Sequence, residues 1–183
     1  MEAEEWHIPL FSKKRWLLEE GLGSMKSFEL DPSDVPLIIR LVENPKYDIG
    51  LFAGAVGLRK HDCVHLLLGR GVQIKDEAFV IGFTMGSTRK MKRWRRNLYM
   101  FCAKHLFPEE YKFKEEERFV FNVAVEAGAR CPTDLSVIDF NKFKNKSISD
   151  TRKELKIDTK LLKTCYQVEK QLFPASMESQ RLL

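Results

Sequence analysis

Apolar residues recur at helical spacing along most of this sequence, and a proline or glycine interrupts each run. Clear runs cover residues 47–68, which end at Gly69, and residues 115–129. Side chains three or four positions apart share one face of a helix, whereas a strand needs strict alternation. No convincing alternation occurs, although a short strand pair at 28–30 or 136–140 stays open. The sequence therefore predicts an all-α protein, a helical bundle of about six to eight helices.

The other expected helices have start and stop signals of their own. One helix begins near Asp31 and stops before Pro45, another begins near Lys75, a further one extends from Ser87 or Thr88 to Leu106, and a last region covers residues 149–173 with a break near Asp158. No internal repeat or low-complexity linker divides the chain. We therefore expect one domain over residues 1–183, with its core at about 31–173 and with flexible, frayed termini.

Charge and cysteine content limit the partners and the compartment. Lys and Arg number 31 and Asp and Glu number 26, so the net charge of +5 suits phosphates, phospholipid headgroups or nucleic acid. The four cysteines form no CxxC pair, which favours a reducing compartment. Uncharged stretches reach about ten residues, half of what a membrane span needs, and the first residues are acidic instead of signal-like. We expect a cytoplasmic protein, at most peripheral to the inner face of a membrane.

The segment with the clearest chemical meaning is His61-Asp62-Cys63-Val64-His65, which is followed after eleven residues by Glu77. On a helix, His61 and His65 lie one turn apart on the same face, and Asp62 projects within the same arc. A glycine turn then lets Glu77 return as a further oxygen ligand. Two imidazoles with carboxylates favour zinc first, then iron or manganese, and magnesium least. The alternative is that the histidines form a chance pair or a helix-capping network.

These residues resemble the HDxxH-x11-E motif of the Coq-four family of ubiquinone (coenzyme Q) biosynthesis proteins. The stretch from His61 to Gly69 is similar to that family's HDxxHxLLG, and residues 152–157 are similar to its short RxELxI element. The resemblance covers roughly residues 35–158. It implies four metal ligands, which are His61, Asp62, His65 and Glu77.

The resemblance also implies a function. Proteins of this family are mostly helical, often dimeric and peripheral to membranes, and they bind polyprenylated quinone precursors in support of the ubiquinone-making complex. The family is linked to replacement of the ring carboxyl group of the precursor. The enzymatic hypothesis is therefore metal-dependent decarboxylation or hydrolysis of a prenylated substrate. The alternative hypothesis is a lipid carrier or scaffold without catalysis.

Two pairs of glycines stand four positions apart within expected helices, Gly50 with Gly54 and Gly82 with Gly86. Glycine inside a helix costs about 1 kcal/mol relative to alanine, so each pair should have a compensating role. Close approach of two helices is one explanation. The other explanation is a groove that accepts a long apolar lipid between helices.

The densest charge run of the chain surrounds Trp94 and comprises Arg89, Lys90, Lys92, Arg93, Arg95 and Arg96. Basic side chains beside an aromatic ring suit contact with anionic lipid headgroups. A solvated face of an ordinary helix is one alternative. Nucleic-acid binding is another, although the run has no nucleic-acid motif. Taken together, the sequence predicts a metal-containing, membrane-peripheral protein that binds a polyprenyl lipid or quinone precursor.

Overall fold

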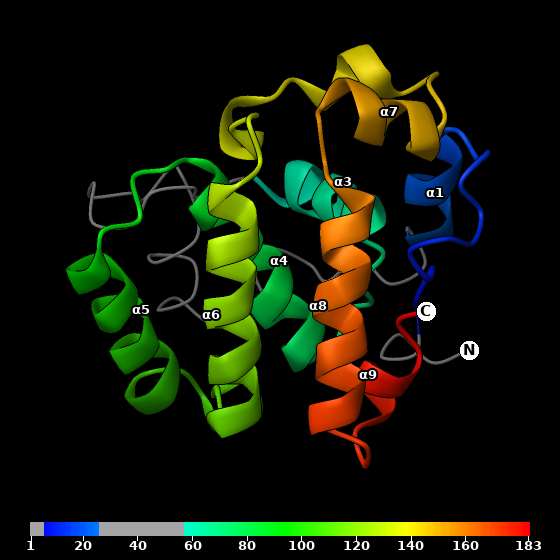
Figure 1. Ribbon diagram of the computed structural model, residues 1–183. Coiled ribbons are helices and arrows are strands. Elements are labelled where there is room, and N and C mark those ends of the chain that lie inside the picture. Colours follow the sequence, from blue (N-terminus) through cyan, green and yellow to red (C-terminus); the bar gives the residue numbers. More distant parts are fainter. Residues whose placement is uncertain (1–5, 26–56) are drawn as a thin grey trace.

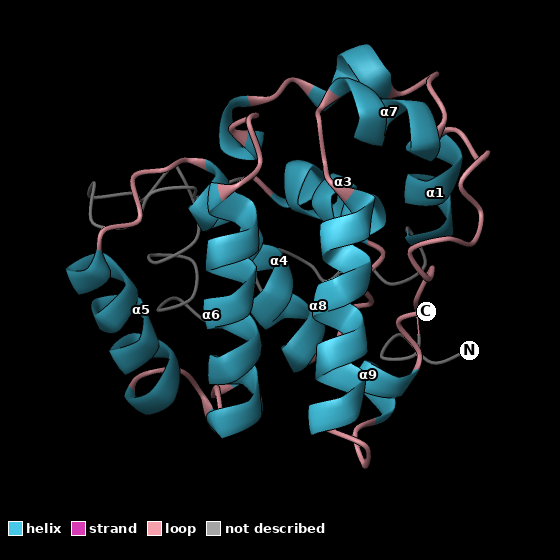
Figure 2. Ribbon diagram, viewed as in Figure 1, coloured by secondary structure: helices cyan, strands magenta, loops and turns pink. Residues whose placement is uncertain are grey.

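The computed structural model describes residues 6–25 and 57–183, and within these ranges the chain is helical without a strand (Figure 1; Figure 2). The all-α prediction is confirmed. The α-helices are α1 (Leu18–Met25), α3 (Leu58–Leu68), α4 (Ile74–Ser87), α5 (Arg93–His105), α6 (Glu115–Ala129), α7 (Ile148–Glu154), α8 (Thr159–Leu172) and α9 (Met177–Gln180). None of these helices is both long and apolar enough to cross a membrane.

Several predictions fall outside the described residues. These are the helix that begins near Asp31, the first part of the 47–68 run with Gly50 and Gly54, and the strand at 28–30. The other suggested strand, at 136–140, is replaced by two short 3-10 turns, Leu135–Val137 and Phe140–Phe143.

Two of the predicted helix boundaries agree with the structure, and one differs. The predicted helix over 115–129 is confirmed as α6. The predicted break near Asp158 separates α7 from α8, because its carboxylate accepts hydrogen bonds from the first backbone N–H groups of α8. The helix expected from Ser87 is wrong at its start. Arg89 adopts a φ of 56°, in the left-handed region, and α5 begins only at Arg93.

Helix α4 lies at the centre of the molecule and packs chiefly on α6, with further contacts to α3 and α9 (Figure 1). Twelve of its fourteen residues are buried, which is why its sequence is apolar on nearly every side. The apolar side chains form two clusters. One joins α4 to α1, α3, α7 and α8, and the other joins it to α5 and α6. A helix enclosed in this way provides a rigid support for any side chain on its first turn.

The glycines of α4 allow direct contact with the backbone of α6. A Cβ atom on Gly82 would lie 2.6 Å from the carbonyl oxygen of Phe121, and one on Gly86 would lie closer still to the carbonyl of Val125. Gly128 of α6 makes the reciprocal approach to Phe83. The backbone of α6 therefore occupies the space in which Gly82 and Gly86 were expected to line a lipid groove. Helix packing is the explanation that the structure supports at these two positions.

The core extends beyond the range of 31–173 on both sides. Trp6, Leu10 and Leu18 are buried before it, and Leu182 is fully buried after it. The segment after Pro174, expected to be frayed, instead forms α9 and packs against α8 and α4. Its contacts with α4 come from a distant part of the chain, so no local pattern in the sequence indicates them.

Helix α3 is anchored at its C-terminal end by side chains from other helices. Gly69 ends the helix with a φ of 71°, and its N–H donates to the carbonyl of His65, as its position after the helical run predicts. Arg152 of α7 donates to the carbonyl oxygens of Leu66 and Leu67 at 3.0 and 2.7 Å. The hydroxyl of Tyr166 in α8 donates to the carbonyl of Leu68 at 2.7 Å. The last carbonyls of a helix lack partners within it, so these donors fix the end that carries His65.

Candidate metal centre

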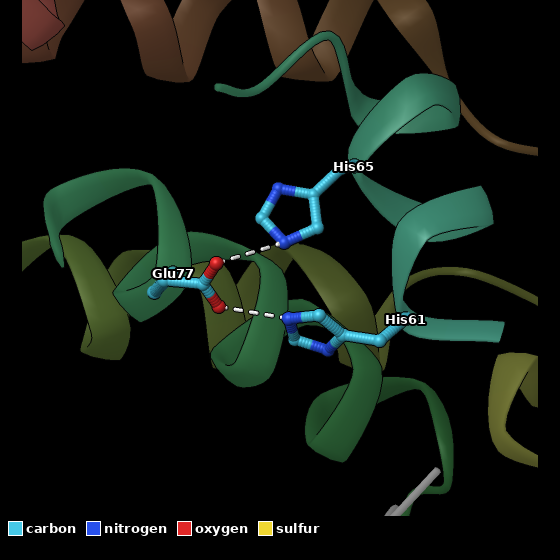
Figure 3. Close-up of side chains that lie close together, drawn as sticks. All are labelled: His61, His65 and Glu77. Atoms are coloured by element: carbon cyan, nitrogen blue, oxygen red, sulfur yellow. Dashed lines mark hydrogen bonds and ion pairs between the residues drawn. The ribbon is translucent and has the colours of Figure 1, made fainter. Parts of the chain in front are cut away.

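Two neighbouring helices bring the motif residues together. His61 and His65 lie one turn apart on α3, and the residues from Gly69 to Gln73 reverse the chain so that Glu77 lies in the first turn of α4. A capping box between Gln73 and Asp76 fixes where α4 begins. Figure 3 shows both imidazole rings turned toward the Glu77 carboxylate from α3. The spacing of eleven residues between His65 and Glu77 therefore produces convergence, as predicted.

The three side chains meet at their ligand atoms. Nε2 of His61 lies 2.7 Å from Oε2 of Glu77, and Nε2 of His65 lies 3.1 Å from Oε1 of the same carboxylate. One donor atom from each residue lies within 4.8 Å of the other two, which is the spacing that a shared metal ion requires. His61, His65 and Glu77 therefore form a group that can hold a metal ion. The imidazole rings of His61 and His65 also contact each other edge to face, with their centroids 4.6 Å apart.

Asp62, the fourth predicted ligand, is not part of this group. It projects about 100° around the α3 axis from His61, and its carboxylate is one methylene shorter than that of a glutamate. The oxygen ligand in the structure comes from α4 instead. Spacing alone placed Asp62 in the right arc of the helix but did not determine whether its side chain reaches the ligand position.

Hydrogen bonding fixes the orientation of His65. Its Nδ1 lies 2.6 Å from the carbonyl oxygen of Gly71, and a carbonyl can only accept, so this nitrogen carries a proton. Nε2 therefore faces Glu77 as the remaining ligand atom. The sequence did not single out Gly71, because a backbone acceptor has no residue signature. Orientation of a metal-binding histidine by a second hydrogen bond is common in metal sites.

Glu77 is ionised in this arrangement. Burial alone would raise the pKa of its carboxyl, but attraction to His65 and His61 and their hydrogen bonds hold that pKa well below its usual range. Without a metal, protons on Nε2 of His61 and His65 would lie between these nitrogens and the carboxylate. A metal ion between these atoms would replace those protons and keep the same three side chains as ligands.

The group is buried on one side and accessible on the other. The side chain of His65 is 1% exposed, that of His61 is 17% exposed and that of Glu77 is 32% exposed. Three protein ligands leave at least one coordination position for water or a substrate oxygen, as in catalytic zinc sites. Two nitrogens and one carboxylate favour zinc, iron or manganese over magnesium.

The predicted basic run is divided between a loop and a helix. Arg89, Lys90 and Lys92 lie in the link before α5, and Arg93, Trp94, Arg95 and Arg96 form its first turn. Several of these cations have protein partners. Arg96 pairs with Glu126 at 2.6 Å, and Arg89 donates to the carbonyl of Cys131. The run is therefore in part a structural feature of the α5–α6 packing.

Large apolar side chains are exposed on α5 and directly after it. Trp94 is 51% exposed and Phe101 is 56% exposed, and Leu106 directly after the helix is half exposed. Beside this face, a pocket of about 330 Å³ lies between α5 and α6 and is lined by Lys104, Arg118 and Phe101 among others. The metal-ligand group contributes no residue to this pocket. Phe101 and Leu106 extend the predicted contact surface beyond the charge run.

No protein-family model matches this chain, and no curated protein or solved structure does so either.

Proposed function

We propose that this protein binds one divalent metal ion through His61, His65 and Glu77, and that the ion holds the oxygen-bearing head group of a lipid. The observation that carries the proposal is the convergence of two imidazole nitrogens and an ionised carboxylate from two helices. A divalent ion in this position supplies a Lewis acid for a carboxylate, phosphate or quinone-type oxygen. The protein residues would position that oxygen on the accessible side of Glu77.

We further propose a polyprenylated quinone precursor or a related prenyl lipid as the bound molecule. The support for this substrate class is the resemblance of the segment from His61 to Gly69, together with residues 152–157, to the Coq-four motifs. The two elements are in contact in the structure. The first contains the proposed ligands His61 and His65 on α3, and Arg152 of the second donates to the carbonyls at the end of that helix.

Native mass spectrometry of the protein as purified, with elemental analysis of the same sample, tests this function. We expect one zinc, iron or manganese ion per chain and a co-purifying prenyl lipid. A folded protein without metal would contradict the proposal, and metal without lipid would contradict the substrate class alone. A mass change of the bound prenyl lipid during incubation would indicate catalysis. An unchanged lipid would favour a carrier.

The α5 surface supports a second part of the proposal, contact with an anionic membrane. Trp94 and Phe101 are exposed on the helix, exposed Arg93 begins it, and exposed Lys90 and Lys92 lie in the link before it. Aromatic rings settle at the lipid boundary while the cations attract anionic headgroups, with about 1 kcal/mol for each cation near the surface. This surface would bring the chain to the phase in which a prenyl lipid resides.

Neutralising three of these cations should release the protein from anionic vesicles. Each loss costs about 1 kcal/mol, so the triple glutamine variant should bind phosphatidylserine-containing vesicles about 100-fold more weakly in a co-sedimentation assay. The matched control removes the same charge from the exposed surface of α7 and α8. Equal weakening by both variants would show that only net charge matters. The substitutions are Lys90→Gln, Lys92→Gln and Arg93→Gln, and the control substitutions are Lys153→Gln, Lys160→Gln and Lys163→Gln.

A further inference from the structure

The segment that follows Pro174 is joined by hydrogen bonds to the first turn of α4, at the two residues that precede Glu77. The ammonium of Lys75 donates to the hydroxyl of Ser176 at 2.6 Å, and the guanidinium of Arg181 donates to the carboxylate of Asp76 at the same distance. Leu182, which follows Arg181 in the sequence, is fully buried. Lys75 and Asp76, which immediately precede Glu77 in the sequence, are therefore both bound by side chains of this segment.

Arg181 also lies against the residue that orients His65. A Cβ atom on Gly71 would collide with the guanidinium of Arg181 and would lie 2.8 Å from an oxygen of Asp76. Gly71 is the residue whose carbonyl accepts the hydrogen bond from Nδ1 of His65. One guanidinium thus covers the loop that orients one metal ligand and pairs with the turn that positions another.

The charges around Asp76 make Arg181 difficult to replace. Asp76 is fully buried, and its other basic neighbour, Arg70, lies 3.6 Å away. Arg70 is itself held between the rings of Phe79 and Tyr166 and is paired with Glu169 through two hydrogen bonds. Loss of Arg181 would leave the buried carboxylate with only two longer contacts, to Arg70 at 3.6 Å and to the backbone N–H of Gln73 at 3.4 Å, which is costly in a protein interior. The residues from Gly71 to Asp76 would be expected to rearrange.

We infer that Arg181 is a positioning residue for the metal centre, which acts on His65 through Gly71 and on Glu77 through Asp76. The inference rests on the proposed metal-binding function. Residues behind the metal ligands typically change metal affinity by about 10- to 100-fold when they are removed. Arg181 is about 100 positions from these ligands in the sequence but belongs to the same site in the structure.

The test compares Arg181→Met with Arg96→Met. Both substitutions remove an ion pair of 2.6 Å to a carboxylate, but Arg96 pairs with Glu126 between α5 and α6, outside the metal-ligand group. We expect Arg181→Met to bind zinc about tenfold more weakly in competition with a chromophoric chelator. Arg96→Met should bind zinc as the unmodified protein does. Arg181→Lys, which keeps the charge opposite Asp76, should recover most of the affinity.

A second readout uses the metal-free protein. Nuclear magnetic resonance follows exchange of the His65 Nδ1 proton with water, and Arg181→Met should accelerate this exchange by about tenfold because the Gly71 acceptor is no longer held. If the unmodified protein binds no zinc, the proposed function fails, and this exchange rate still decides the role of Arg181.

Two results would overturn the inference. One is unchanged exchange and unchanged zinc affinity in Arg181→Met. The other is an equal loss of affinity in Arg181→Met and Arg96→Met, which would indicate a general effect on stability. If Arg181→Met does not fold, the milder Arg181→Gln takes its place with the same expected direction and the same contradictory results.

Discussion

Replacing both imidazole ligands, as His61→Ala with His65→Ala, should abolish zinc binding at micromolar concentrations. The double substitution removes both nitrogen donors and leaves Glu77 as the one remaining member of the group. Loss of an outer partner alone costs about 10- to 100-fold in affinity, so loss of two direct ligands costs far more. Isothermal titration with zinc, checked by circular dichroism for retention of helix, measures the effect.

Two further variants make this result specific. Glu77→Gln keeps the size of the side chain but removes the anionic ligand, so it should weaken zinc binding strongly with little change in packing. Asp62→Asn lies on the same helix outside the ligand group and should leave the affinity nearly unchanged. Zinc binding by the double alanine variant, or its loss in Asp62→Asn, would contradict the three-ligand site. Affinity should also fall as the pH is lowered, because protons compete with the metal for the imidazole nitrogens.

Arg152→Met should lower the free energy of unfolding by about 3 kcal/mol. Arg152 is 4% exposed, and its guanidinium donates to three carbonyl oxygens, those of Leu66, Leu67 and Leu10. Its removal leaves these acceptors buried without a donor, and each such group costs about 1–3 kcal/mol. Burial lowers the pKa of Arg152 to about 10, so the side chain is still charged near pH 7. Urea denaturation of the metal-free protein measures the change.

The neighbouring residue provides the control for this prediction. Lys153 lies on the same helix, is 77% exposed and pairs with Asp150 at 3.4 Å. Lys153→Met should therefore change the free energy of unfolding by less than about 0.5 kcal/mol. Similar effects of the two substitutions would show that capping of α3 does not determine stability.

The sequence was most informative where a structural cause is local. The end of α3 at Gly69, the start of α8 after Asp158 and the extent of α6 depend on residues within a few positions, and all three were predicted. The pairing of His61 and His65 also follows from one helical turn. For the same reason the spacing predicted a candidate metal-binding group, and three of its four predicted members come together in the structure.

The remaining features depend on contacts between distant residues. The spacing of Gly82 and Gly86 is compatible both with a lipid groove and with close helix packing. The position of the α6 backbone decides between the two. The segment with Arg181 has no strong helical run that would predict an ordered structure. It is held by Asp76, which is about 100 positions away in the sequence. Arg89 reverses the backbone before α5 although the residues around it are compatible with a continuous helix.

The way in which α3 is held has a consequence for how an ion would enter the site. His65 lies near the C-terminal end of α3, which Arg152 and Tyr166 hold by hydrogen bonds. It faces Glu77 on α4, which packs against α6. His61 lies one turn closer to the other end, where the Arg59–Glu19 pair is largely exposed to solvent. Of the three side chains, His65 is thus enclosed by protein, whereas His61 and Glu77 border the solvent. An ion arriving from solvent would meet His61 and Glu77 first, and contact with the buried His65 would complete its binding.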